Sequence, residues 1–419
     1  MPLHSIEIAA AVLFAVALLH TFAARQLVRL GHRFPQHEGL FHLLGEVEVV
    51  FGFWAMVLVL VLTALTSWRS AVDYVETREF TEPLFVFVIM VIAASHPVLV
   101  TLRAAVDWLA RLLPVQRELA VAWVCLAVLP LLGSLVTEPA AMTMSALLLA
   151  PRVFRIEVAE RHKYLALGVL FVNVSIGGVL TSYAAPPVLM VAGTWDWDSA
   201  FMASTFGWKA ALAVLVNATI ACWFLRNALR ELPPAATQDD GPAVPATVRL
   251  VHLAFLAAVV LTAHHRVVFF ALFLFFLGFT TAYARFQRPL LIKEALLVAF
   301  FLAGLVVLGG MQDWWLEPLV SGLDAQSLFF GALALTAVTD NAALTYLGSL
   351  IEGLSSAARY ALVAGAVAGG GLTVIANAPN PAGVALLRNG FQDATVGAGG
   401  LLLGALGPTA IAALAFLVL

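Results

Sequence analysis

The feature that most constrains this chain is a carboxylate placed inside an apolar segment, which occurs twice, at Glu138 and at Asp340. Further along the chain, each acid is followed by a Gly-rich run that ends in small residues, hydroxyl or amide side chains and prolines. These runs lie at 177–187 and at 369–381. A carboxylate inside an apolar segment is energetically costly and marks a functional position. Interrupted apolar segments at corresponding places in two halves of a chain indicate a transport site.

The composition is that of a membrane protein. Hydrophobic residues make up 62% of the sequence and charged residues 11%, with a mean hydropathy of +0.98. Ordinary soluble domains have about 25% charged residues, so that class is excluded. Apolar runs long enough to cross a bilayer recur along the chain, which predicts an all-α polytopic membrane protein. The net charge of −3 and the lack of a long basic tract argue against nucleic acid as a partner.

About ten apolar runs predict membrane-spanning helices, divided equally between two halves. In the first half, residues 1–230, they lie near 5–24, 43–66, 83–101, 162–192 and 207–226. In the second half, residues 249–419, they lie near 249–264, 267–284, 290–309, 358–388 and 397–418. Glycines and prolines predict that 162–192 and 358–388 are broken helices, and His96-Pro97 predicts a kink in 83–101. The polar stretch 231–248 predicts a cytoplasmic linker between the halves.

Two further apolar stretches, near 119–150 and 322–351, are too short for two crossings, which need about forty residues. Each carries its acid close to the middle. A re-entrant hairpin explains both facts, because it enters the membrane, turns at the acid and leaves by the same face.

Positively charged loops support this layout, because cytoplasmic loops are rich in arginine and lysine. Arg111 and Arg117 precede the first hairpin, and Arg152 and Arg155 follow it, so both of its flanks are predicted to be cytoplasmic. Both chain termini are then predicted to lie outside. Since each half has an odd number of spans, the second half enters the membrane upside down relative to the first. The expected architecture is an inverted-topology repeat.

A carboxylate at bilayer depth requires a partner, a proton or a cation. Competition between a proton and a cation for the same carboxylates would amount to exchange. Helix capping is the alternative explanation for each acid, because hairpin tips expose free backbone N–H groups. Two acids at equivalent places favour an ion-binding site over capping. At the breaks, a simple proline kink is the alternative to an ion site. Hard cations prefer oxygen ligands, and the predicted ligands are Asp340, Asn341, Thr339, Asn377, Asn380, Glu138, Thr137 and Ser182.

Three other polar residues, Glu46, Glu48 and Asn173, are candidates for a proton path. Snorkelling or a pair with Arg33 is the alternative for the two glutamates, and a helix–helix hydrogen bond is the alternative for Asn173. The sequence has no HExxH, GxSxG or phosphate-binding Gly loop, so we expect no enzyme activity. We likewise expect no cofactor, and no metal beyond a transported cation.

The paired carboxylate hairpins and Gly-rich broken helices resemble the ion transporter superfamily, and within it most closely the putative Na+/H+ antiporter family. The resemblance covers nearly the whole chain as architecture, but its specific matches are two short patches per half. It implies re-entrant hairpins whose tips meet unwound helices at a midplane site, often in a homodimer. Dicarboxylate symporters of this superfamily carry Ser-Asn-Thr type tips, whereas here acids occupy the tips at 137–139 and 339–341. Two acids would attract a cation and repel an anion.

We therefore expect a secondary antiporter of the bacterial inner membrane that exchanges Na+, or another monovalent cation, for H+ by alternating access. An ion-coupled carrier of arsenite or an organic anion is the alternative within the superfamily. A membrane-embedded enzyme built on His264, His265 and the acids is a third hypothesis. The expected partners are membrane lipid and a small cation.

Overall fold

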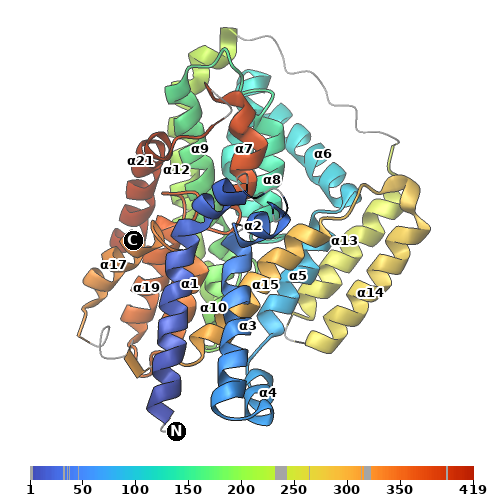
Figure 1. Ribbon diagram of the computed structural model, residues 1–419. Helices are drawn as coiled ribbons and strands as arrows, with labels where there is room; N and C mark the ends of the chain where they lie inside the picture. Colours follow the sequence, from blue (N-terminus) through green and yellow to red (C-terminus); the bar gives the residue numbers. More distant parts are fainter. Residues whose placement is uncertain are drawn as a thin grey trace.

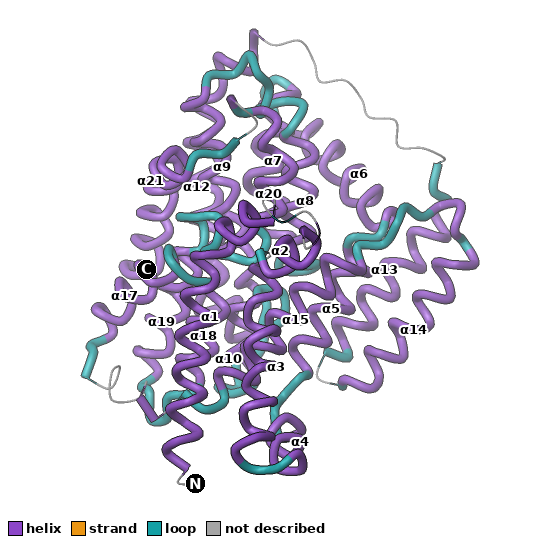
Figure 2. The backbone as a smooth tube through the Cα atoms, viewed as in Figure 1, coloured by secondary structure: helices purple, strands orange, loops and turns teal. Residues whose placement is uncertain are grey.

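The computed structural model describes residues 3–31, 34, 36, 38–45, 47–231, 243–263, 265–312, 314–315, 322–392 and 395–419. Within these residues every regular element is a helix and no strand occurs (Figures 1 and 2). Many of the helices run roughly parallel or antiparallel to one another (Figure 1). This arrangement agrees with the helical class that the composition predicts.

The helices of the first half end at the polar linker. They are α1 (Leu3–Gly31), α2 (Glu38–Leu44), α3 (Val47–Leu65), α4 (Trp68–Glu76), α5 (Thr81–Ala93), α6 (His96–Leu112), α7 (Arg117–Leu132), α8 (Glu138–Leu149), α9 (Glu160–Gly177), η2 (Gly178–Leu180), α10 (Pro186–Ala192), α11 (Ser199–Met202), η3 (Ala203–Gly207) and α12 (Trp208–Glu231).

The helices of the second half follow the linker. They are α13 (Ala246–Leu261), α14 (Arg266–Ala282), η4 (Ala284–Phe286), α15 (Ile292–Gly309), α17 (Ala325–Thr336), α18 (Asn341–Ser349), α19 (Ser356–Gly369), α20 (Asn380–Leu387), η5 (Arg388–Gly390) and α21 (Ala398–Val418). The inverted relation between the two halves stays a prediction.

Among the described residues, three helical stretches are long and apolar enough to cross a membrane: Glu160–Leu180, Ser199–Arg230 and Ala398–Val418. Helices α5 and α6 form a fourth candidate, bent by 66° where they meet. Pro97, in the first turn of α6, lacks the N–H that a continuous helix would need there. The kink predicted at His96-Pro97 is therefore confirmed. The other apolar helices are shorter, and the count of about ten crossings stays a prediction.

Both predicted hairpins form a helix–turn–helix unit. In hairpin 1, α7 packs against α8 across the turn 133–137, and in hairpin 2, α17 contacts α18 across the turn 337–340. The acids lie at these turns, as predicted. Entry of the hairpins into the membrane from one face stays a prediction.

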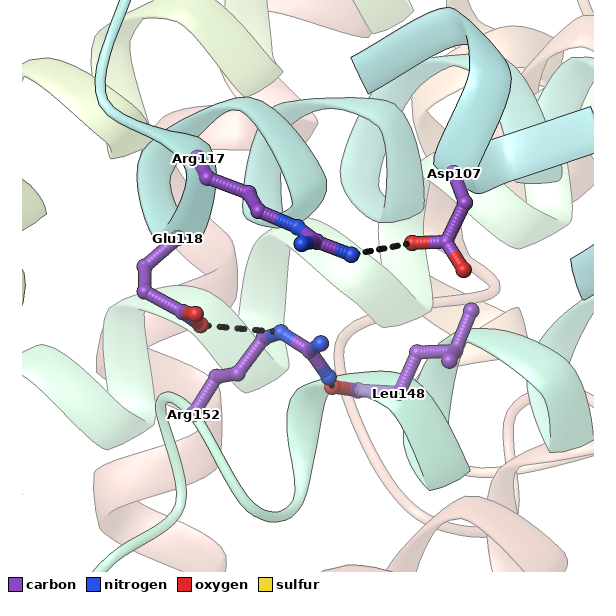
Figure 3. A network of polar contacts seen from close by, with 5 residues as sticks. All are labelled: Asp107, Arg117, Glu118, Leu148 and Arg152. Atoms are coloured by element: carbon purple, nitrogen blue, oxygen red, sulfur yellow. Dashed lines mark hydrogen bonds and ion pairs between the residues drawn. The ribbon is translucent and has the colours of Figure 1, made fainter. Parts of the chain in front are cut away.

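Polar contacts close the base of hairpin 1 (Figure 3). Arg152, just after α8, forms an ion pair with Glu118 in the first turn of α7 at 3.0 Å, with the two side chains 15% and 13% exposed. Arg152 also donates to the backbone oxygen of Leu148 at 2.7 Å. A more exposed pair, Arg117 with Asp107 at 3.4 Å, joins α7 to α6. The beginning and end of hairpin 1 therefore lie together.

Both predicted broken helices are interrupted where the glycines and prolines fall. After α9 and η2, the first resumes at Pro186 as α10, and after α19 the second resumes at Asn380 as α20. The resumed parts cross over: α10 packs against α18 of hairpin 2, and α20 packs against α8 of hairpin 1 (Figure 2). The first parts stay with their own hairpins, α9 with α7 and α8, and α19 with α17 and α18. This crossing brings the tips and the breaks together.

The buried side chains form two large apolar clusters. The first surrounds α7, α8, α9, α12, α19 and α21, and the second surrounds α1, α3, α5, α13, α14 and α15. Residues beside the tips belong to the second cluster, namely Val136, Ala140, Ala342 and Ala343. The bodies of the hairpins belong to the first. The tips therefore lie at the border between two packed units.

Candidate ion-binding site

Glu138 is the central group of the candidate site. It is the first residue of α8 and its side chain is fully buried, at 0% exposure. The side-chain amide of Asn377 donates to its Oε2 at 2.8 Å. Its other oxygen, Oε1, has no hydrogen-bond partner among the described residues. One hydrogen bond does not compensate a buried ionised carboxylate, so Glu138 is a candidate position for a proton or a cation.

A glycine makes room for this carboxylate. A Cβ on Gly178, at the start of η2, would lie 2.5 Å from Oε1 and 2.8 Å from Cγ of Glu138. Any other residue at 178 would therefore displace the acid. The Gly-rich run thus does more than interrupt the helix, because its backbone forms one wall of the site.

Asp340 lies at the tip of hairpin 2 as the N-cap of α18. Its Oδ1 accepts from the backbone N–H groups of Ala342 at 2.8 Å and Ala343 at 3.2 Å. The capping alternative is therefore borne out for Asp340. In hairpin 1 the N-cap is Thr137, whose hydroxyl accepts from the N–H of Ala140 at 3.3 Å. Capping therefore does not account for Glu138.

Asp340 and Asn377 line a small cavity of about 30 Å³, together with Phe301 of α15. A water molecule needs roughly 10–15 Å³ of such space, so this cavity has room for a water or a small ion. Asp340 also lies within electrostatic reach of Glu138. Asn377 lies between the two acids: its amide donates to Glu138, and it lines the same cavity as Asp340. The structure thus brings Asp340, Asn377 and Glu138 together.

Asn341 occupies in hairpin 2 the position that Glu138 occupies in hairpin 1. It is fully buried, its backbone N–H donates to the oxygen of Ala376 at 3.1 Å, and its amide lies 3.4 Å from the hydroxyl of Ser175. A Cβ on Gly370 would collide with Ser175 and lie 2.9 Å from the amide nitrogen of Asn341. Gly370 therefore faces Asn341 as Gly178 faces Glu138.

Two further hydrogen bonds fix this correspondence. Thr181, after the first break begins, donates to the backbone oxygen of Ser134 at 2.6 Å, and Thr373 donates to that of Ala337 at 2.8 Å. Glu138 and Asn341 each follow the accepting residue by the same interval. The expectation that the two acids occupy equivalent places is therefore wrong by one residue. Asp340 corresponds to Thr137, because both are N-caps, and Glu138 corresponds to Asn341.

Four buried oxygen atoms at the tips and breaks have no hydrogen-bond partner among the described residues. They are Glu138 Oε1, Asn341 Oδ1, Asn377 Oδ1 and Asn380 Oδ1. The amide of Asn380 donates to the backbone oxygens of Gly370 at 2.8 Å and Thr373 at 2.9 Å, which orients its own oxygen away from them. Buried oxygens normally have partners, and carboxylate and amide oxygens are the type of ligand that hard cations prefer.

The remaining predicted ligands have other hydrogen bonds. The hydroxyl of Thr339 donates to the oxygen of Leu335 at 2.9 Å, and that of Ser182 lies 3.2 Å from the hydroxyl of Ser199. Thr137 is occupied as the cap of α8. Their part in ion binding stays a prediction. Glu46 lies outside the described residues, and the side chain of Glu48 in α3 is not described.

Asn173 forms a helix–helix connection. Pro130 inside α7 has no N–H, so the oxygen of Leu126 one turn earlier loses its helical partner. The amide of Asn173 donates to this oxygen at 2.7 Å and to that of Val214 at 3.2 Å. Its own oxygen accepts from Asn217 at 2.9 Å. These contacts give Asn173 a structural role, and its place in a proton path stays a prediction.

A larger cavity of about 440 Å³, with polar and apolar walls, also borders α15. Its walls include Arg78 and Thr194 from two loops, Val306 of α15 and Tyr346 of α18. Along α18, Tyr346 is about 9 Å from Asp340, from the rise per residue of a helix. Along α15, the buried Leu305 follows Phe301, which lines the small cavity, and precedes Val306, which lines the larger one.

Sequence reasoning missed several residues that shape the site. The two wall glycines, Gly178 and Gly370, were predicted only to interrupt helices. The bonds of Thr181 and Thr373 to the hairpin turns carried no sequence signal beyond their place in the Gly-rich runs. Within the described part of the chain, no cluster of three or more His, Cys, Asp or Glu side chains could hold a metal ion.

Comparisons with known proteins give a similar solved structure and a matching family. Among solved structures, the chain is similar to the YdaH transporter of Alcanivorax borkumensis, with a TM-score of 0.45 and 14% identity, covering 88% of this chain and 96% of that chain. A search of curated protein sequences finds no significant match. The family described as "Putative Na+/H+ antiporter" matches residues 5–419. Since that match spans nearly the entire sequence, the chain belongs to the putative Na+/H+ antiporter family.

Proposed function

We propose that this membrane transporter exchanges Na+, or another monovalent cation, for H+ at the site formed by Glu138, Asn377 and Asp340. The observation that carries the proposal is the fully buried Glu138 with one bonded and one unpartnered oxygen. Its neighbour Asp340 lines a cavity large enough for a small ion. Oxygen ligands and negative charge favour a hard cation over an anion.

The two acids have different parts in this proposal. Asp340 accepts from two backbone N–H groups at the positive end of α18, and these compensate its negative charge. Glu138 is the first residue of α8, but the N-cap bond there is made by Thr137, so in this proposal its charge is neutralised either by a proton or by the cation. Binding of one at Glu138 therefore displaces the other. That competition couples the two ions without any cofactor.

Alternating access follows from the packing in this proposal. The tips and breaks lie at the border of two apolar clusters, so that one packed unit can move against the other while the site stays intact. The polar cavity at Arg78 and Tyr346 is the proposed access route on one side. In this proposal, the buried Leu305 of α15, between Phe301 and Val306 in the sequence, is part of the barrier that closes this route.

Proton movement in proteoliposomes tests the proposal. A pH-sensitive dye in the lumen reports H+ flux when Na+, Li+ or K+ is added outside. We expect Glu138→Gln and Asp340→Asn each to abolish cation-driven H+ movement, while the purified proteins remain folded and monodisperse. Asp324→Asn is the matched control, because Asp324 is also an N-cap of hairpin 2, at α17, but lies exposed at the base. It should retain exchange.

Unchanged exchange in Glu138→Gln or Asp340→Asn would refute the proposed site. The same vesicles distinguish the alternative carrier function. Uptake of arsenite or a dicarboxylate that depends on a Na+ gradient, with no cation-driven H+ movement in the wild type, would refute cation/proton exchange.

A further inference from the structure

An apolar groove of about 400 Å³ lies between α7 and α12, away from the ion site. Leu119 and Trp123 of α7 form one wall, and Cys222 and Trp223 of α12 form the other. The loop between α6 and α7, at 113–115, covers one end. The indole N–H of Trp123 donates to the hydroxyl of Thr219 at 3.1 Å, which satisfies the polar groups at the opposite end. The body of the groove is therefore suited to a hydrocarbon chain.

Two arginines lie where α12 ends and line the same groove. Arg226 and Arg230 are one helical turn apart and so share a face of α12. Arg226 stacks on the ring of Trp223 at 3.6 Å and donates to its backbone oxygen at 2.7 Å. Neither arginine forms an ion pair with a carboxylate among the described residues. Each guanidinium keeps N–H donors for a phosphate.

The groove is thus apolar along its length and cationic at one end. From Thr219 to Arg230 it extends about 16 Å along α12, by the rise per residue of a helix. Trp223 is 63% exposed beside the arginines, as is typical of tryptophans at the level of lipid head groups. Both arginines lie at the end of α12, next to the linker 231–248 that the sequence predicts to be cytoplasmic, and the cytoplasmic leaflet is anionic.

We propose that this groove binds one anionic phospholipid, with an acyl chain against Trp123 and Cys222 and the phosphate on Arg226 and Arg230. Basic pockets between membrane helices at the cytoplasmic side recognise anionic head groups through this combination of charge and apolar surface. A free phosphate would use the arginines but leave the groove empty. A zwitterionic lipid would fill the groove but carry no net charge for the arginines.

Native mass spectrometry of the full-length protein in neutral detergent tests the site. The probes are dioleoylphosphatidylglycerol, dioleoylphosphatidylcholine and glycerophosphoglycerol, the head group without acyl chains. We expect one dioleoylphosphatidylglycerol per chain to bind more tightly than either of the other probes. Arg226→Gln and Arg230→Gln should each weaken it about five-fold, from the contribution of one arginine near an anionic head group. The double variant should weaken it about thirty-fold if the two effects add.

Arg285→Gln is the matched control. Arg285 stacks on Phe286 at 4.5 Å, as Arg226 stacks on Trp223, and carries the same charge, but it does not line the groove. We expect its lipid affinity to equal that of the wild type. Three results would overturn the proposal: equal affinity for the two lipids, competition by the head group alone, or an equal loss in Arg285→Gln. The lipid comparisons use wild-type protein, so they decide the question even if an arginine variant fails to fold.

Discussion

The side-chain amide of Asn377 donates to Glu138 at 2.8 Å, and this bond joins the break of the second half to the hairpin of the first. The bond depends on the crossing of α20 onto α8. It supplies the buried carboxylate with its one hydrogen bond to a described residue. In the proposed exchange, a cation or proton at Glu138 would change a contact between the two halves, and this contact would link ion binding to movement.

Removing that amide should weaken cation binding. In Asn377→Ala, Glu138 loses a charge-assisted hydrogen bond worth about 1.5–3 kcal/mol, so we expect the Na+ concentration for half-maximal exchange to rise at least about tenfold. Dye-reported H+ flux at varied Na+ measures it. Asn389→Ala, at an exposed position in η5, should leave the Na+ dependence unchanged. Equal Na+ dependence in Asn377→Ala and the wild type would show that this bond has no part in binding.

A methyl group on the wall glycine should displace the acid. Gly178→Ala would place a Cβ 2.5 Å from Oε1 of Glu138, so we expect exchange to fall more than about tenfold, as misplacement of a reacting group by 1 Å can cost about a hundredfold. Gly278→Ala in α14 is the control, because nothing lies within 4 Å of its Cβ. That variant should be as active as the wild type and slightly more stable. If Gly178→Ala exchanges normally, the carboxylate does not need its present position.

Asn173 and Pro130 should be coupled in stability. Asn173→Ala leaves the oxygen of Leu126 without a partner, which costs about 1–3 kcal/mol in the free energy of unfolding. Pro130→Ala restores the backbone N–H that this oxygen would accept within α7. The loss from Asn173→Ala should therefore be smaller by about 1 kcal/mol in the Pro130→Ala background. Chemical unfolding in detergent measures the four proteins, and additive losses would exclude this role for Asn173.

The ion pair at the base of hairpin 1 should contribute more than its exposed neighbour (Figure 3). A double-mutant cycle on Glu118 and Arg152, both largely buried at 3.0 Å, should give a coupling of about 1–2 kcal/mol, between typical surface and buried pairs. The cycle on Asp107 and Arg117, at 3.4 Å and more exposed, should give about 0–0.5 kcal/mol. Equal couplings in thermal unfolding would show that the buried pair does not hold the hairpin closed.

The polar cavity should admit water-soluble reagents. Both native cysteines, Cys125 and Cys222, are buried, so the wild type provides a low background. We expect Thr194→Cys, which lines the cavity, to react with a membrane-impermeant cationic thiol reagent, and the label to inhibit exchange. Ser70→Cys, exposed on α4, should react without inhibition. Full activity of labelled Thr194→Cys would exclude the cavity as the access route.

The helical class, both hairpins and both breaks were predicted from the sequence because each rests on a local cost. A carboxylate such as Glu138 cannot lie in lipid without a partner, and prolines such as Pro186 and Pro379 cannot continue a helix. Hairpin length follows from the thickness of a bilayer. These constraints act within a few residues, so they can be read along the chain.

Tertiary packing decided which residues of the two hairpins correspond to each other. The sequence placed Glu138 and Asp340 as equivalents, yet the cap positions and the bonds of Thr181 and Thr373 pair Glu138 with Asn341. A shift of one residue at a tip leaves the apolar pattern unchanged, so no local signal reveals it.

By itself, the sequence determined that two acids lie at the tips of two hairpins beside broken helices, because burying charge and bending helices have costs that local chemistry sets. Only the tertiary structure decided that Asn377 binds Glu138 and that Gly178 makes room for the carboxylate. Both contacts arise where α20 crosses onto α8 and η2 approaches the first tip, and such contacts depend on how distant helices pack.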